Sequence, residues 1–238
     1  MKFALSFIVL AISFVWIASP WEPSWRWIFF WPAANLLVAS FFYMINSPAC
    51  FGKKKTGALR ILNYLFFLPY VVGLWWVWFL FAKHARENPF DMVNKQLWIG
   101  RRLDEREAAQ SDFENIIDLT AEFTEVPAFR ERNYIPLYML DGAVPDAHAL
   151  KKLVAKFSQL TGKSLVHCAQ GHGRTGLVAV AILLETNPQL DLDSALEILK
   201  RARPGVHCNK RQVRFLRDYF QKYFADRQHQ SPDLPKQV

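Results

Sequence analysis

Three long apolar runs that carry almost no charge open the chain, at about residues 3–19, 27–45 and 61–81. Each run is close to the ~20 residues that an α-helix needs to cross a bilayer, so the pattern predicts three transmembrane helices within residues 1–82. Eight of the nine tryptophans lie in this part of the chain, the exception being Trp98, and several stand at the ends of the runs. Tryptophan is enriched at membrane–water interfaces, so these positions agree with a membrane region.

The first run also fits a secretory signal peptide, because Met1 and Lys2 precede an apolar core and the small residues Ala18 and Ser19 close it. Two further apolar runs follow directly. A cleaved signal peptide would therefore still leave a membrane protein, and three membrane helices are the preferred interpretation.

The pattern changes at about residue 89, where short apolar segments begin to alternate with amphipathic ones. Strands are predicted at residues 96–100, 113–119, 134–137 and 165–167, and helices at 104–111, 147–160, 175–185, 194–202 and 210–223. Strands that alternate with helices predict an α/β domain over residues 83–225, with a central sheet flanked by helices. The last residues, 226–238, have few apolar side chains and are predicted to be disordered.

The segment between the last predicted strand and the next helix has the sequence His167-Cys168-Ala169-Gln170-Gly171-His172-Gly173-Arg174-Thr175-Gly176. Its three glycines let the backbone curl until the N–H groups point inward, and the positive end of the following helix dipole adds to the same field. A loop of this kind binds phosphate. The same groups and Arg174 favour the thiolate form of Cys168 over the thiol, so Cys168 is the candidate nucleophile. The planar guanidinium of Arg174 is suited to hold two oxygens of a phosphoryl group.

The pattern His-Cys-x5-Arg-Thr-Gly resembles the signature of the cysteine-dependent protein tyrosine and dual-specificity phosphatase superfamily, and the resemblance covers about residues 92–223. It implies an α/β fold and a phosphocysteine intermediate on Cys168. It also implies that the phosphate lies among the residues from Ala169 to Arg174: Ala169, Gln170, Gly171, His172, Gly173 and Arg174. In the family, the histidine at the position of His167 orients the loop, and the hydroxyl at Thr175 assists departure of the thiolate.

A phosphatase of this type also needs a group that gives a proton to the leaving oxygen. Asp141 lies 27 residues before Cys168, directly after a predicted strand, and Asp141-Gly142-Ala143-Val144-Pro145 resembles the acid-bearing loop of the superfamily. Asp141 is therefore the candidate general acid and then base. Asp146 is the alternative, although its position favours a cap for the helix that starts near residue 147. The resulting mechanism uses no metal and no cofactor.

The expected substrate is a phosphorylated protein or a membrane phospholipid. Relatives that act on polyphosphoinositides tend to carry lysines inside the loop, whereas Ala169, Gln170 and His172 bring no permanent charge, so headgroups with many phosphates are disfavoured. The alternative function is a non-catalytic phosphate-binding protein or a membrane scaffold. A phosphate-binding protein of this kind would be expected to have lost Cys168, Arg174 or Asp141, and all three are present.

The net charge is +8. Residues 1–82 hold six basic and one acidic side chain, and the rest of the chain holds 23 basic and 20 acidic ones. The rest of the chain is therefore only mildly basic. The basic clusters at 200–203 and 210–217 are predicted to be solvated helix faces, or a surface that meets lipid headgroups or an acidic substrate. Aromatic residues are not interleaved with them for base stacking, so no nucleic-acid partner is predicted.

The orientation in the membrane is close to a tie by charge alone. The basic loop 46–60 favours a cytoplasmic position for itself, and the basic segment after residue 82 does the same, although a third membrane crossing would separate the two. A nucleophilic thiolate is best preserved in a reducing compartment, which favours a catalytic domain on the cytoplasmic face.

Three cysteines, Cys50, Cys168 and Cys208, form neither a disulfide framework nor a metal-ligand spacing. Cys208 has two interpretations. It is either a resolving thiol for an oxidised Cys168 or, as is more common, a packed bystander.

Overall fold

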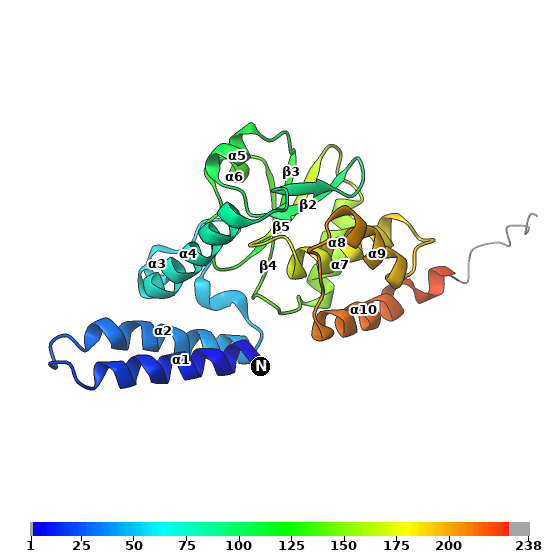
Figure 1. Cartoon of the computed structure of the whole chain (residues 1–238). Coiled ribbons are helices and arrows are strands. Elements are labelled where there is room, and N and C mark those ends of the chain that lie inside the picture. The colour runs from blue at the N-terminus through cyan, green and yellow to red at the C-terminus, as the bar shows by residue number, and fades with distance from the viewer. Residues whose placement is uncertain (1, 229–238) are drawn as a thin grey trace, which may run out of the picture.

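The computed structural model of the protein describes residues 2–228, and a five-stranded sheet lies at its centre in the order β1-β2-β5-β3-β4 (Figure 1). The strands are β1 (Phe90–Met92), β2 (Leu97–Arg101), β3 (Asn115–Thr120), β4 (Asn133–Met139) and β5 (Ser164–Cys168). β1 is antiparallel to β2, and every other pairing is parallel. The predicted α/β domain with a central sheet is confirmed, with the short edge strand β1 as an addition.

Helices cover both faces of the sheet. They are α5 (Glu105–Gln110), α6 (Pro127–Arg130), α7 (Ala147–Phe157), α8 (Gly173–Thr186), α9 (Leu192–Ala202) and α10 (Lys210–Gln228). Successive residues of a strand point to opposite faces, so Ile116 and Leu165 pack toward α5 and α6, while Ile117 and Val166 pack toward α7 and α8. All four side chains are fully buried. The near-continuous apolar strands therefore reflect a sheet that is covered on both sides.

Two details of the predicted helices need correction. Helix α9 begins two residues earlier than expected, because Asp191 rather than Asp193 caps it by accepting a hydrogen bond from the Ser194 N–H at 2.7 Å. Helix α10 continues to Gln228, so it includes the first residues of the segment predicted to be disordered. The remainder of that segment, 229–238, lies outside the described residues.

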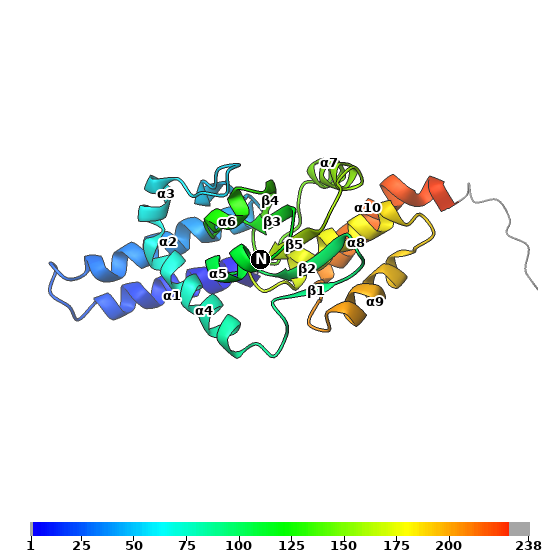
Figure 2. The same ribbon diagram turned by 90° about the horizontal axis from the view of Figure 1, so that it is seen from above.

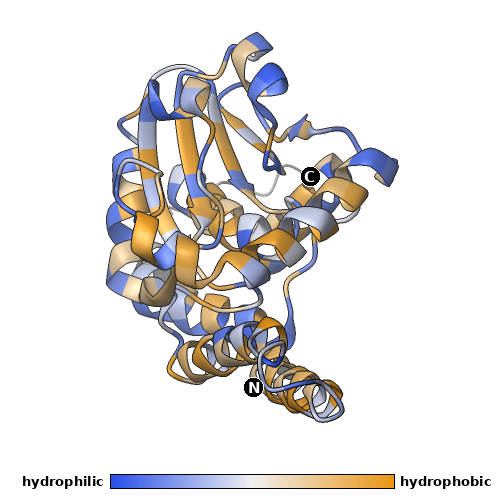
Figure 3. Cartoon of the chain, turned by 90° about the vertical axis from the view of Figure 1, so that its left-hand side faces the viewer, coloured by the Kyte–Doolittle hydropathy of each residue, from blue (hydrophilic) through white to orange (hydrophobic). Residues whose placement is uncertain are grey.

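The first two apolar runs form an antiparallel hairpin, α1 (Lys2–Ala18) and α2 (Trp27–Met44), which extends away from the sheet (Figures 1 and 2). Its open end lies at the α/β domain, where Ser40 Oγ donates to the Ala4 carbonyl at 2.9 Å. In Figure 3 most of the hairpin ribbon has the colours of hydrophobic residues. Among the described side chains, every exposed large apolar one except Met92 lies within residues 3–80.

One helix of the described residues, α2, is both long and apolar enough to cross a membrane, and α1 is apolar but slightly shorter. The third predicted span is not a single helix. Residues 61–81 divide at Phe67 into α3 (Ile61–Phe66) and α4 (Leu68–His84). Pro69 has no N–H to donate and disfavours helical geometry at the residue before it, which explains why the helix restarts here.

The loop between the hairpin and α3 packs directly onto the sheet. It contains a short 3₁₀ helix, η1 (Pro48–Phe51), and its Lys53 ammonium donates to the Asp118 carboxylate in β3 at 2.5 Å. The Gly57 carbonyl accepts a hydrogen bond from the Glu125 N–H at 2.8 Å. An apolar cluster joins Phe51 to residues that follow β3 and β4, including Ala121 and Leu140. Residues before the predicted domain boundary at 83 are therefore packed as part of the α/β domain.

Candidate active site

The loop that follows β5 is the centre of the candidate site. β5 ends at Cys168 and α8 begins at Gly173, so the predicted order of strand, loop and helix is present. Cys168 is 3% exposed, and its sulfur accepts a hydrogen bond from the Gly171 N–H at 3.3 Å. Gly171 has a φ of 78°, and a Cβ there would lie 2.4 Å from the Gly100 carbonyl carbon. Only glycine fits this position, because its backbone is both left-handed and pressed against β2.

Arg174 lies in the first turn of α8 and is held almost completely buried. Its two terminal nitrogens donate to the two carboxylate oxygens of Glu122 at 2.7 and 3.0 Å, and one of them also donates to the Met139 carbonyl at 3.0 Å. Burial alone would lower the pKa of Arg174, but Glu122 and Asp141 more than offset this effect and raise the pKa above its ordinary value. The paired contact fixes the plane of the guanidinium.

Sequence reasoning missed Glu122. The feature that could have identified Glu122 is its position two residues after the end of β3, because β3 is the strand next to β5. Because parallel strands end at the same edge of a sheet, side chains that follow β3 meet the loop that follows β5. The edge was predictable from the strand pattern, but the order of the strands in the sheet was not.

Asp141 follows β4, and its side chain lies next to Arg174. Its carboxylate oxygen lies 3.5 Å from Arg174 Nε, and its side chain is 57% exposed. Gly142, with a φ of 66°, makes the turn, and its carbonyl accepts a hydrogen bond from Asn209 at 2.9 Å. Asp146, the alternative acid, accepts a hydrogen bond from the Ala149 N–H at 2.8 Å and caps α7. The structure therefore brings Asp141, and not Asp146, next to Arg174.

Two residues to which the sequence analysis gave no role in the site, Glu87 and Arg203, contact the outer side of the loop. His172 Nε2 lies 2.8 Å from a Glu87 carboxylate oxygen, and the same oxygen lies 2.9 Å from Arg203. Arg203 is fully buried and also donates to the Gln170 carbonyl at 3.3 Å. The prediction of a solvated face for the cluster at 200–203 is thus wrong for Arg203, because two acidic partners draw it under the loop. The second partner is Asp91, at 2.6 Å.

His167 points away from the loop into a buried polar cluster. Its Nε2 lies 3.3 Å from a Glu125 carboxylate oxygen and 4.0 Å from Asp118, and in the described part of the chain neither ring nitrogen has a hydrogen-bond partner. Burial lowers the pKa of His167 to about 4, so the ring is neutral at neutral pH. Burial and the neighbouring Asp118 raise the pKa of Glu125 to about 8. The predicted role of His167 in orienting the loop stays a prediction.

Asp118, Glu125 and His167 lie close enough together to suggest a metal site, but the hydrogen bonds of Asp118 argue against one. One of its oxygens accepts from Lys53 and from the Tyr134 hydroxyl, both at 2.5 Å. The other accepts from the N–H and the hydroxyl of Thr120, at 2.8 and 2.7 Å. A carboxylate has about four lone-pair positions, so these four bonds leave none for a metal ion. Lys53 supplies the positive charge of the cluster instead.

Two further predicted residues lie at the rim of the loop. Thr175 is buried at the start of α8, and its hydroxyl has no hydrogen-bond partner within residues 2–228. Cys208 is partly buried, with its sulfur 4.0 Å from the Gly173 carbonyl, and burial raises the pKa of its thiol to about 11. All three cysteines are free thiols in the structure.

A cavity of about 790 Å³ opens above the loop. Its floor is formed by the loop itself with Cys168 and Arg174, and one side by Glu122 and Asp141. The N-terminal helices, Phe123, the segment 207–209 and the start of α10 also line it. The predicted nucleophile, arginine and acid are thus brought together at one opening.

The mixed sheet, with a glycine-bearing loop and a helix start at the carboxyl end of its middle strand, places the chain in the class of α/β proteins that bind phosphoryl groups at that edge. The comparisons with known proteins specify this class. The family model of the dual specificity phosphatase catalytic domain matches residues 99–222, more than half of the chain. The chain belongs to that family.

Solved structures agree with the family. Tk-PTP in its active form is 25% identical over 56% of this chain and 97% of its own, with a TM-score of 0.52. PTPMT1 in complex with PI(5)P is 15% identical over 57% of this chain and 96% of its own, with a TM-score of 0.51, and shows similarity of fold alone. No curated protein matches the chain.

Proposed function

We propose that the chain is a membrane-anchored phosphatase that hydrolyses phosphate monoesters through a phosphocysteine on Cys168. The observation that carries the proposal is the convergence of Cys168, Arg174 and Asp141 on one cavity, with Arg174 held in place by Glu122. The substrate is a phosphorylated protein or a phospholipid. Among similar structures, the one of PTPMT1 contains PI(5)P.

The reaction has two steps. In the first, the Cys168 thiolate attacks phosphorus, the bond from phosphorus to the leaving oxygen breaks, and Asp141 gives its proton to that oxygen. In the second, water attacks phosphorus while Asp141 takes up its proton, the bond to sulfur breaks, and inorganic phosphate leaves. Arg174 and the N–H groups of the loop stabilise the charge that develops on the phosphoryl oxygens in both steps.

Replacing Asp141 by asparagine tests the assignment of the acid. We expect kcat/KM of the full chain for an alkyl phosphate to fall by about 10²–10³-fold, because the alkoxide then leaves without a proton. For p-nitrophenyl phosphate the expected loss is less than about tenfold, since nitrophenolate is a good leaving group without protonation. The matched control is Asp146→Asn, which keeps a side chain that caps α7 and should retain activity. Equal losses on both substrates would show that Asp141 does not protonate the leaving group.

The membrane anchor that we propose is the hairpin of α1 and α2. An α-helix needs about 17–25 residues to cross a bilayer, and these helices have 17 and 18. Their large apolar side chains are exposed along the hairpin, among them Val9, Ile12 and Trp16. A water-soluble protein rarely exposes such a continuous apolar surface, so it supports contact with lipid. Trp21 and Trp25 stand in the connecting loop, where an aromatic belt would lie.

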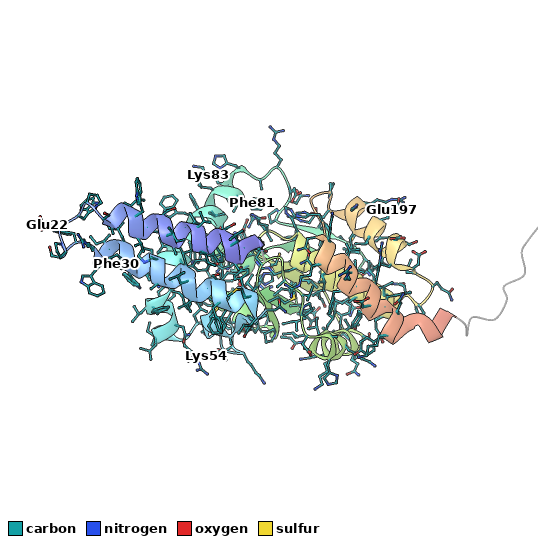
Figure 4. The ribbon with its side chains drawn as sticks, turned by 90° about the horizontal axis from the view of Figure 1, so that it is seen from below. Glu22, Phe30, Lys54, Phe81, Lys83 and Glu197 are labelled. Atoms are coloured by element: carbon teal, nitrogen blue, oxygen red, sulfur yellow. The ribbon has the colours of Figure 1, made fainter. Side chains whose placement is uncertain are left out.

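If the anchor is a hairpin of two helices, the basic loop 46–60 and the basic segment after residue 82 are not separated by a third membrane crossing. The loop 46–60 contacts the sheet through Lys53 and Asp118, so this loop and the catalytic domain lie on the same side of the membrane. In Figure 4, Glu22 marks the far end of the hairpin, while Lys54 and Lys83 lie toward the catalytic domain. Both basic segments then fall on one side, and the positive-inside rule favours the cytoplasm for that side.

Labelling of single cysteines in intact bacterial cells tests this orientation. With the full chain in the inner membrane, we expect Pro23→Cys to react with a membrane-impermeant maleimide from outside. Lys54→Cys should react only after the cells are permeabilised. Labelling of both positions in intact cells, or release of the protein from the membrane by alkaline carbonate, would contradict the proposed anchor.

A further inference from the structure

One wall of the cavity above Cys168 is built from the N-terminal helices. The residues on this wall are Phe3 from α1, Tyr43 from α2, and Tyr70, Leu74, Val77 and Trp78 from α4. Cys168 and Arg174 at the floor and Asp141 line the same cavity. The cavity is thus polar at its floor and apolar on the side that faces the membrane anchor.

Most residues of the wall lie on one face of α4. Tyr70, Leu74 and Val77 are spaced by four and three residues, so they lie on one stripe of the helix. Other faces of α4 expose large apolar side chains such as Val72 and Trp76, at 45% and 62%. The helix that lines the cavity is therefore apolar on the outside as well, and the wall is continuous with the apolar surface of the N-terminal region.

α4 and α1 are held against the catalytic domain. The Arg102 guanidinium carbon lies 4.7 Å from the ring centroid of Trp75 and 5.2 Å from that of Trp78, which fixes α4 next to the end of β2. Phe3 lies against Gly142, so close that a Cβ on Gly142 would be 2.8 Å from its ring. The apolar wall is thus part of the site and touches the loop that carries Asp141.

The chemistry of the wall selects one kind of substrate. A bound polypeptide presents N–H and C=O groups, and each one that loses water without a new hydrogen bond costs free energy. Leu74 and Val77 offer no such partner. A hydrocarbon chain needs none and gains from leaving water. At the rim, Lys210 and Arg211 can neutralise a further anionic group of a headgroup.

From these contacts we infer that the substrate is a membrane lipid with a terminal phosphate monoester, whose apolar chain lies along α4 while its phosphate reaches Cys168 and Arg174. This inference rests on the proposed function and adds the substrate class to it. The phosphoryl group passes from the lipid oxygen to the cysteine sulfur, and the lipid leaves as the alcohol with the proton of Asp141. Because the wall continues into the anchor, the lipid need not leave the bilayer surface to react.

The test uses the full chain in detergent micelles and compares long- and short-chain forms of the same headgroup. The substrates are the dioleoyl and dihexanoyl forms of phosphatidate and of phosphatidylglycerophosphate, together with a phosphotyrosine peptide. We expect kcat/KM for at least one dioleoyl lipid to exceed that of its dihexanoyl form by at least about tenfold, a factor that burial of a few methylene groups provides. The phosphotyrosine peptide should be the poorer substrate.

A matched pair of variants on α4 tests the wall itself. Val77→Ser should lower the ratio of long-chain to short-chain kcat/KM by about fivefold, because it removes apolar contact with the chain. Val72→Ser makes the same change on the same helix outside the cavity, and the ratio should stay as in the unaltered chain. Val77 is 58% exposed and Val72 45%, so neither substitution threatens the fold.

The outcomes separate the inference from the proposed function. Release from the peptide or from short-chain lipids at an efficiency equal to or above that of long-chain lipids would overturn the lipid inference and leave the phosphatase proposal standing. Equal ratios in Val77→Ser and Val72→Ser would overturn the role of the wall. The absence of Cys168-dependent release from every substrate, including p-nitrophenyl phosphate, would overturn the proposed function and the inference with it.

Discussion

Replacing Cys168 by serine is expected to abolish phosphate release, with a loss of at least about 10⁴-fold in kcat for every substrate. A thiolate is a strong nucleophile by itself, whereas a serine hydroxyl needs a base to remove its proton. The Cys168 sulfur accepts a hydrogen bond from the Gly171 N–H at 3.3 Å, and this group is a donor and not a base. His167 could have served as a base, but its ring points to Glu125 at 3.3 Å. The measurement is the rate of phosphate release by the full chain in detergent.

The same variant should still bind phosphate, because Arg174, Glu122 and the N–H groups of the loop are unchanged. Binding of inorganic phosphate measured by calorimetry should therefore persist in Cys168→Ser. Cys50→Ala is the control, since Cys50 packs in the apolar cluster with Phe51 and is not among the described residues that line the cavity. Phosphate release by Cys168→Ser at the rate of the unaltered chain would remove Cys168 as the nucleophile.

Replacing Lys53 by methionine is expected to destabilise the fold by about 3–5 kcal/mol, although Lys53 lies 65 residues before its partner. The side chains of Lys53 and Asp118 are 1% and 0% exposed, and Lys53 also donates to the carbonyl and the hydroxyl of Thr120. Burial alone would raise the pKa of Asp118, but Lys53 and His167 more than offset this effect and hold it below its ordinary value. Without Lys53, the carboxylate is left buried without its cation.

Thermal unfolding in detergent, followed by near-ultraviolet circular dichroism, measures this effect. We expect Tm to fall by roughly 10 °C in Lys53→Met. Adding Asp118→Asn to the same chain should recover part of the loss, because the unpaired charge is then removed. Lys55→Met is the matched control on the same loop, since Lys55 is exposed and should change stability by less than about 0.5 kcal/mol. A Tm in Lys53→Met equal to that of Lys55→Met would show that the loop does not stabilise the domain.

This contact affects how the protein can be studied. A fragment that begins at residue 83 lacks Lys53, and it also lacks Gly57, whose carbonyl pairs with the Glu125 N–H. Such a fragment would leave Asp118 without its cation. The full chain is therefore the form in which activity should be assayed.

Local patterns were sufficient for much of the fold. Alternation of apolar strands with amphipathic helices after residue 89 predicted the α/β class, because these periods depend only on neighbours in the sequence. The α9 cap was misplaced by two residues, since Asp191 and Asp193 both suit a helix start and the backbone conformation decides between them. The prediction of a third membrane span as one helix was wrong, because apolar composition indicates burial in lipid or protein but does not show where a helix breaks.

The amino-acid sequence is enough to identify the local chemistry of this protein: a cysteine, glycines and an arginine at fixed spacing between a strand and a helix, with an aspartate after the preceding strand. Spacing of this kind is a local property, so residues within one loop can be placed without knowing the fold. Which distant residues support that loop depends on the three-dimensional fold. Glu122 reaches Arg174 because β3 lies next to β5. Lys53 reaches Asp118 because the loop between α2 and α3 packs on the sheet, and α4 lines the cavity because it packs against the same domain. These contacts depend on strand order and helix packing, which arise from the free energy of the whole chain rather than from any one segment.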